Sequence, residues 1–149
     1  EVGFNYRLTN MQAALGVAQL ERAQIFIDKK RWIAREYDRN FIKHSEIITP
    51  IEIKDHLNSY WLYTIIIKDV DREKLSDVSE NLMSKGIETR PLFFPLHEMP
   101  PYVEYSKGAE HYVNSSTLSK SGLCLPGAFS ITSTDISYIC ISVLEALGE

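Results

Sequence analysis

The sequence contains few cysteines. Only Cys124 and Cys140 occur among 149 residues, each within an apolar stretch. Neither has the Cys-x₂-Cys spacing of a zinc site or of a redox pair, and isolated thiols are typical of a reducing compartment. The histidines are scattered along the chain and have no His-x₃-His companion: His44, His56, His97 and His111. We therefore expect buried free thiols, no bound metal and a cytoplasmic location.

Long apolar runs and an excess of positive charge are absent too. No run approaches the roughly 18–20 apolar residues that a membrane-spanning helix requires. A net charge of −4 and a pI near 5.6 argue against general nucleic-acid binding. The one basic cluster, Lys29-Lys30-Arg31, has acidic residues around it and is typical of a solvated helix face. We expect neither a nucleic acid nor a membrane as partner.

The first forty residues predict one long helix. Thr9 and Gln12 fit a capping box, and apolar residues then recur at three- and four-residue steps. The helical pattern continues to Phe41, and about 33 residues at ~1.5 Å each span about 50 Å, enough to link two domains. Residues 13–18 are small and uncharged, which predicts burial against a partner, whereas the charged second half predicts a domain surface.

The rest of the sequence alternates between strand and helix patterns. The expected elements are a short strand within 45–58, a strand over 60–67, a helix capped by Asp71, a strand over 87–90 ended by Pro91, an irregular segment over 92–102, a helix over 110–120, a strand over 123–125 and a last helix capped by Thr134. This order predicts an α+β fold, a short sheet with helices on one side. The expected division is a linking segment over 1–44 and a small α+β domain over 45–149. The aromatic residues at 60, 61 and 63 are expected in the core and sheet face, and those at 93, 94 and 102 in packing.

Two runs resemble a known family. Residues 3–20, beginning GFNYRLTNMQAALG, are similar to the signature of the DegT/DnrJ/EryC1/StrS family, which comprises pyridoxal-phosphate (PLP)-dependent aminotransferases of nucleotide-linked keto-sugars. A second similarity lies in GIETRP at 86–91 and PLH at 95–97. The resemblance implies the small C-terminal domain of a fold-type-I PLP-dependent transferase, hence the C-terminal part of a larger enzyme. It also implies a homodimer that associates through the N-terminal segment and the long helix. The second run most resembles perosamine-synthase-type members, which use a GDP-linked 4-keto-6-deoxymannose.

The resemblance implies a cofactor role for Asn5. In the family, the matching Asn reaches the phosphate of PLP bound mainly by the other subunit, and a helix N-terminus also favours an anion. The alternative is an Asn that hydrogen-bonds within its own turn. The Schiff-base lysine is expected N-terminal to this chain, because the lysines here lie in polar, solvated contexts; we expect no catalytic residue and no activity of the chain alone.

Four further residues are candidates for binding the substrate. Tyr6 and Arg7 follow Asn5, and an arginine can hold a diphosphate in a bidentate way; the alternative is an ion pair between subunits. Arg90 and His97 bracket a proline-rich loop, which the resemblance places near the sugar or its phosphates. The alternative for His97 is a hydrogen bond to a loop carbonyl.

The resemblance implies a parent enzyme that moves an amino group from glutamate to a nucleotide-linked keto-sugar, for surface polysaccharide (O-antigen) or glycoside biosynthesis. Two alternatives stay open: a sugar dehydratase relative of the same family, and a stand-alone, non-catalytic α+β module for binding or dimerisation. An upstream reading frame that encodes a cofactor lysine would exclude the stand-alone module.

Overall fold

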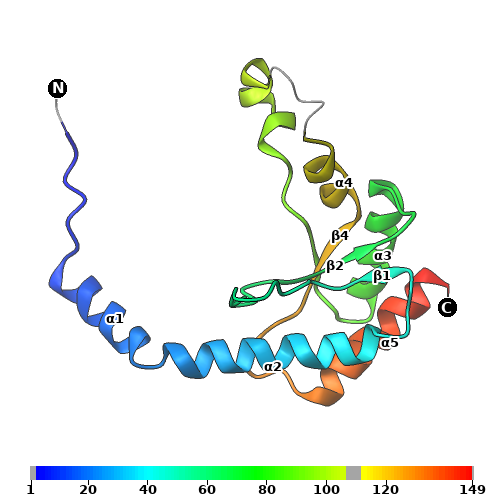
Figure 1. Ribbon diagram of the computed structural model, residues 1–149, viewed down its shortest axis with the longest axis horizontal. Helices are drawn as coiled ribbons and strands as arrows, with labels where there is room; N and C mark the ends of the chain where they lie inside the picture. The colour runs from blue at the N-terminus through cyan, green and yellow to red at the C-terminus, as the bar shows by residue number, and fades with distance from the viewer. Residues whose placement is uncertain (1–2, 107–111, 149) are drawn as a thin grey trace.

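A computed structural model describes residues 3–106 and 112–148 (Figure 1). In chain order its elements are α1 (Asn10–Leu20), α2 (Ala23–Phe41), β1 (Ile47–Ile48), β2 (Tyr63–Ile67), α3 (Arg72–Ser84), β3 (Arg90–Pro91), the 3₁₀ helices η1 (Leu96–Glu98) and η2 (Pro100–Tyr105), α4 (Val113–Ser121), β4 (Gly122–Leu125) and α5 (Ser133–Leu147). The mixture of helices with a small sheet confirms the predicted α+β class.

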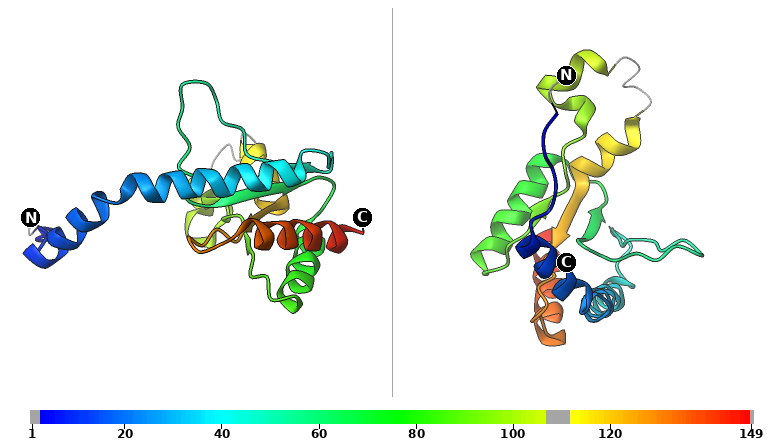
Figure 2. Two further views of the ribbon diagram at one scale, coloured as in Figure 1. Left: turned by 90° about the horizontal axis from the view of Figure 1, so that it is seen from below. Right: turned by 90° about the vertical axis from the view of Figure 1, so that its left-hand side faces the viewer.

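The sheet has the strand order β1-β2-β4-β3, and all of its pairings are antiparallel. Strand β2 alternates, with Tyr63, Ile65 and Ile67 buried and the residues between them half-buried. Helices α2, α3 and α5 supply the rest of this core, and α5 runs alongside α2 (Figure 2). Their fully buried side chains include Ile33, Tyr37, Phe41, Leu82, Ile136 and Val143. The helices therefore share one core with one face of the sheet, as the sequence predicts.

The single long helix predicted over the first forty residues is wrong: the structure has two helices with a turn between them. The capping box at Thr9 and Gln12 is confirmed, with the Thr9 amide 2.9 Å from Gln12 Oε1. At the turn, the Arg22 amide donates to the Gln19 carbonyl at 3.1 Å, a tight i→i−3 bond that ends α1. No residue of α1 is buried, whereas the C-terminal half of α2 lies in the core, so packing within the chain fixes only α2. Helix α1 and residues 3–9 extend away from the sheet (Figure 1).

The last helix starts two residues earlier than predicted. Its N-cap is Thr132, not Thr134, because Asp135 lies three residues after Thr132 and completes a capping box. Thr132 Oγ1 accepts from the Asp135 amide at 3.2 Å, and Asp135 Oδ2 accepts from the Thr132 amide at 2.9 Å. The hydrogen bonds that Thr132 Oγ1 (2.7 Å) and the Thr132 amide donate to the Asp135 carboxylate lower the pKa of Asp135. By contrast, the predicted cap of α3 by Asp71 is confirmed.

Other boundaries also differ from the prediction: β2 begins at Tyr63 and not at residue 60, and β4 begins at Gly122 and not at residue 123. The strand expected over 87–90 is only β3, in which Pro91 does not end the strand but pairs with Leu123. Proline is accepted there because β3 lies at the edge of the sheet. The helix expected over 110–120 is α4; positions 110 and 111, with His111, lie outside the described residues.

The basic cluster on α2 is not the solvated face that its pattern predicts. Lys29 Nζ donates to the Ile131 carbonyl at 2.8 Å, and Lys30 Nζ donates to the carbonyls of Gly127 at 2.7 Å and Trp61 at 3.2 Å. Partial burial lowers the pKa of Lys30. Both ammonium groups therefore tie α2 to loops distant in sequence, a role that the local pattern of charges does not reveal.

Arg31, the third basic residue of the cluster, anchors the loop before β2 to α2. Its guanidinium binds both carboxylate oxygens of Glu52, at 2.6 and 3.0 Å, and donates to the Asn58 carbonyl at 2.8 Å. The hydrogen bonds from Arg31 hold the pKa of Glu52 at about 2. The loop is thereby fixed over the N-terminal half of α2.

Both cysteines are buried free thiols, as predicted, with Cys124 5% and Cys140 2% exposed. Burial raises the pKa of Cys140 to about 12, so this thiol is unreactive at neutral pH. Within residues 3–106 and 112–148, no three His, Cys, Asp or Glu side chains gather as a metal site would require. Nor does any helix in these ranges have the length and apolar character to span a membrane.

Candidate functional site

The N-terminal segment, residues 3–9, is an exposed, irregular stretch ahead of α1. Asn5 Oδ1 accepts from the Arg7 amide at 3.0 Å and from Arg7 Nε at 3.2 Å. The Asn5 side chain thus forms a hydrogen bond within its own turn, which is the alternative that the sequence left open for this residue. Its Nδ2 group remains as a donor, and Tyr6 is 87% exposed beside it. The three residues therefore lie together with donor groups available to a ligand.

The structure separates Arg90 from His97. Arg90 is exposed on β3, with its guanidinium 3.5 Å from Glu88 Oε1, and it lines a hollow of about 600 Å³ together with Cys124 and Tyr138. His97 lies on η1 and lines a different hollow, of about 640 Å³. The two residues bracket one loop in sequence but face different cavities.

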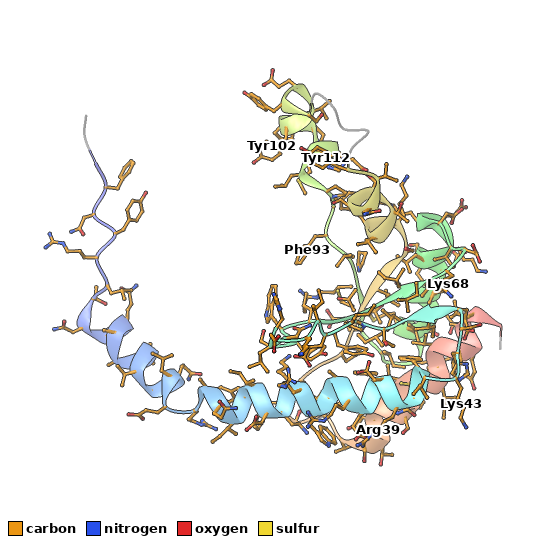
Figure 3. All side chains as sticks on the ribbon, in the orientation of Figure 1. Arg39, Lys43, Lys68, Phe93, Tyr102 and Tyr112 are labelled. Carbon is orange, nitrogen blue, oxygen red and sulfur yellow. The ribbon has the colours of Figure 1, made fainter. Side chains whose placement is uncertain are left out.

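We call the second cavity the aromatic hollow. It is lined by Leu92, Phe93, Phe94, Pro95, Leu96, His97, Tyr102, Tyr105, Ser106, Tyr112, Ser115 and Leu118. Figure 3 shows Phe93, Tyr102 and Tyr112 along the arm formed by η1, η2 and α4, which projects from the sheet. Its volume lies within the range of small-molecule sites.

The aromatic residues of this arm make some packing contacts, such as Phe94 beneath the Arg72 guanidinium at 4.0 Å, but remain more exposed than the sequence predicts. Phe93, Phe94 and Tyr102 are 66%, 52% and 49% exposed. Trp61, expected in the core with its buried neighbours Tyr60 and Tyr63, is 70% exposed and stacks on Phe93 with ring centroids 6.5 Å apart. Pro95 is the N-cap of η1, and Pro100 and Pro101 begin η2, so this segment forms short 3₁₀ turns and no helix or strand that continues the sheet.

His97 is the most enclosed of the candidate residues, with 14% of its side chain exposed. Its Nε2 lies 3.2 Å from Ser116 Oγ on α4, and its ring centroid lies 5.0 Å from that of Tyr112. Ser116 Oγ in turn donates to Glu98 Oε1, which lies 3.7 Å from His97 Nε2. The partner of His97 is thus a hydroxyl on a helix and not a loop carbonyl.

Among the described residues, donors fit the phosphate of PLP, but no lysine is placed to hold its aldehyde. Asn5 Nδ2 and the amides at the start of α1 that the capping box does not use are donors of the kind that bind phosphate at a helix N-terminus. A Schiff base needs a lysine in a cavity, and neither the aromatic hollow nor the hollow at Arg90 is lined by a lysine. Lys29 and Lys30 are held by backbone carbonyls.

The sequence could have revealed part of what it missed. The density of aromatic residues between 93 and 112 was a signal for Tyr105 and Tyr112 in the aromatic hollow. Glu98 is adjacent to His97 and was available as a charged partner. Ser116 had no signal, because its contact with His97 joins positions 19 residues apart on different elements.

Known proteins share this fold. The Helicobacter pylori aminotransferase PseC, involved in the biosynthesis of pseudoaminic acid, matches 99% of the chain with a TM-score of 0.82 at 22% identity, over 40% of its own length. The E. coli GDP-4-keto-6-deoxy-D-mannose-3-dehydratase, with bound hydrated PLP, matches 95% of the chain with a TM-score of 0.71 at 24% identity, over 36% of its length. The fold is therefore one that sugar aminotransferases and such a dehydratase share.

The family follows from the sequence. The chain belongs to the DegT/DnrJ/EryC1/StrS aminotransferase family, whose model matches residues 1–144. It is 39% identical over 148 residues to the GDP-perosamine synthase of Escherichia coli O157:H7, which covers 99% of the chain. The chain spans 39% of the length of that relative.

Proposed function

We propose that the protein to which this chain belongs is a PLP-dependent aminotransferase that moves an amino group from glutamate to a nucleotide-linked keto-sugar. The observation that carries the proposal is the 39% identity to a GDP-perosamine synthase along nearly the whole chain. It favours a GDP-linked 4-keto-6-deoxymannose as substrate and a role in surface polysaccharide or glycoside biosynthesis. The proposed location is the cytoplasm.

In this proposal, the N-terminal segment of the chain first supplies residues to the cofactor site of a second copy. Residues 3–20 expose apolar side chains of the kind that seek a partner surface: Phe4, Tyr6, Leu8, Met11, Leu15, Val17 and Leu20. We propose that two copies associate through this segment and the helices that follow it. Asn5 Nδ2 of one copy then donates to the phosphate of the PLP held mainly by the other.

The second contribution is to the substrate. PLP, when bound, supplies the electron sink that amino transfer requires. The chain binds and orients the sugar nucleotide. The exposed aromatic rings around His97 offer faces to stack against, and guanidinium groups for the phosphates come from Arg90, which lines a different hollow, and from Arg7, which follows Asn5 into the site of the other copy. Tyr6 is exposed and follows Asn5, so its hydroxyl group is proposed to bind the substrate beside the cofactor phosphate.

The full-length protein tests this function in two steps. Glutamate alone should convert bound PLP to its amine form and release 2-oxoglutarate, and the amine form should then convert a GDP-linked 4-keto-6-deoxymannose to an amino sugar, detected by mass spectrometry. A deoxygenated keto-sugar product without nitrogen would instead establish the dehydratase alternative. No reaction with either substrate would favour the non-catalytic module.

Replacing Asn5 by alanine should weaken PLP retention and leave the KM for the sugar nucleotide unchanged. One hydrogen bond to a phosphate contributes roughly 0.5–3 kcal/mol, about a few-fold to a hundredfold in affinity. The measurement is PLP release during dialysis, followed by absorbance. Asn81→Ala, on the exposed face of α3, is the matched control. Unchanged PLP retention in Asn5→Ala would assign Asn5 to its local turn alone.

A further inference from the structure

The contacts of His97 determine which of its ring nitrogens carries a proton. His97 lines the aromatic hollow, and two further groups contact it: Ser116 Oγ lies next to His97 Nε2, and the Glu98 carboxylate lies next to Ser116 Oγ. The distances are 3.2 Å from Nε2 to Oγ and 3.7 Å from Nε2 to Glu98 Oε1, so the direct hydrogen bond of the ring is to the serine. No described residue forms a hydrogen bond with His97 Nδ1.

The direction of these bonds follows from counting protons. An ionised carboxylate only accepts hydrogen bonds, and a serine hydroxyl has a single proton to donate. Ser116 Oγ gives that proton to Glu98 Oε1. Toward His97 it can then only accept, so His97 Nε2 must be the donor. A neutral imidazole with a proton on Nε2 has an unprotonated Nδ1, which is an acceptor.

We propose that Glu98 and Ser116 hold His97 as the Nε2–H tautomer, so that Nδ1 accepts a hydrogen bond from an O–H or N–H group of the sugar nucleotide. This proposal rests on the proposed function and deepens it. Glu98 and Ser116 act through His97 and are positioning residues. They come from η1 and α4, so their contact also holds the two sides of the arm together.

The tautomer restricts what His97 can recognise. A phosphate oxygen at neutral pH is an acceptor, and two acceptors facing each other repel. A sugar hydroxyl or an N–H of the base is a donor and suits Nδ1. In its neutral form His97 is therefore suited to the sugar or the base and not to the diphosphate, which narrows the role that the sequence left open.

Glu98→Gln is the informative substitution because a glutamine has nearly the shape of a glutamate but can donate a hydrogen bond, so it can reverse the direction of the hydrogen bonds from residue 98 through Ser116 to His97. A glutamine amide can donate to Ser116 Oγ, which frees the serine proton for His97 Nε2 and moves the ring proton to Nδ1. Ser116→Ala removes the relay altogether. Glu104→Gln, an exposed residue of η2 outside the lining of the hollow, makes the same chemical change without this contact.

The experiment uses the full-length protein labelled with ¹⁵N-histidine, at mildly alkaline pH where imidazole side chains are neutral. Long-range ¹H–¹⁵N spectra, assigned with His97→Gln, should show the Nε2–H tautomer in the wild-type protein and in Glu104→Gln. Glu98→Gln should shift His97 toward the Nδ1–H tautomer and raise the KM for the sugar nucleotide about tenfold, with the rate of the glutamate reaction unchanged.

An Nδ1–H tautomer in the wild-type protein, or an unchanged tautomer in both Glu98→Gln and Ser116→Ala, would overturn the proposal whatever the enzyme does. A shifted tautomer with an unchanged KM would also overturn it, since Nδ1 would then not meet the substrate. The NMR spectra report the tautomer of His97 whether or not the enzyme converts substrate. If the predicted tautomers appear but no amino sugar forms, the proposed function fails while the assignment of the relay is supported.

Discussion

Replacing His97 by alanine in the full-length enzyme should raise the KM for the sugar nucleotide about tenfold to a hundredfold. The imidazole is largely enclosed in the wall of the aromatic hollow, so its loss removes both a hydrogen bond and a ring contact with Tyr112. The glutamate reaction should keep its rate, because the smaller glutamate does not fill that part of the site. Steady-state kinetics with each substrate varied in turn measures both effects.

The control for this substitution is His56→Ala, which removes a histidine whose Nδ1 contacts only the nearby Lys54 carbonyl among its described hydrogen bonds. It should leave both half-reactions unchanged. Equal losses in both half-reactions for His97→Ala would mean that His97 supports the fold of the arm and does not bind the sugar nucleotide.

Gly122→Ala should destabilise the domain by about 1–3 kcal/mol, as overpacking in a dense core usually does. A Cβ at this position would lie 2.7 Å from the Leu118 carbonyl oxygen and 2.8 Å from Leu92 Cβ. Its backbone, with φ −89° and ψ 129°, suits any residue, so the cost is steric and not conformational. Thermal unfolding followed by circular dichroism should show a Tm lower by about 2–12 °C.

Gly16→Ala is the matched control for this prediction, measured on the same chain at a concentration at which it is monomeric, because Gly16 lies in the segment proposed to join two copies. Apart from the backbone of α1 itself and the two chain neighbours, no atom of the described residues lies within 4 Å of a Cβ built at Gly16. Alanine also favours a helix more than glycine does, by up to about 1 kcal/mol, so the Tm should stay the same or rise. If Gly122→Ala has no larger effect than Gly16→Ala, then Leu92 moves aside and the contact does not limit the packing.

The parts of the fold that the sequence predicts are those with a complete local signal. Thr9 with Gln12 and Asp71 before α3 carry their cap partners within three residues, and β2 alternates between the core and the outer face. The prediction failed where the decisive partner is distant. The carbonyls bound by Lys30 lie 31 and 97 residues away, so its pattern of charged neighbours predicts the wrong environment.

The candidate site shows the same division. The resemblance selected Asn5, Tyr6, Arg7, Arg90 and His97 as single positions, and their roles stay predictions until the substitutions are made. The resemblance did not predict which of these residues lie close together in the structure. The separation of Arg90 from His97 and the contact of His97 with Ser116 depend on the path of the arm between β3 and β4. That path is determined by prolines and by tertiary contacts, not by a periodic pattern.

The sheet edges bear on how copies of this protein can assemble. The outer strands, β1 and β3, have two residues each, and in β3 one of them is Pro91, which has no amide hydrogen to offer. A strand of another chain would pair with unpaired backbone N–H and C=O groups at a sheet edge, and such short edge strands offer very few of them. Contacts between copies are therefore left to side-chain surfaces and not to the edges of the sheet.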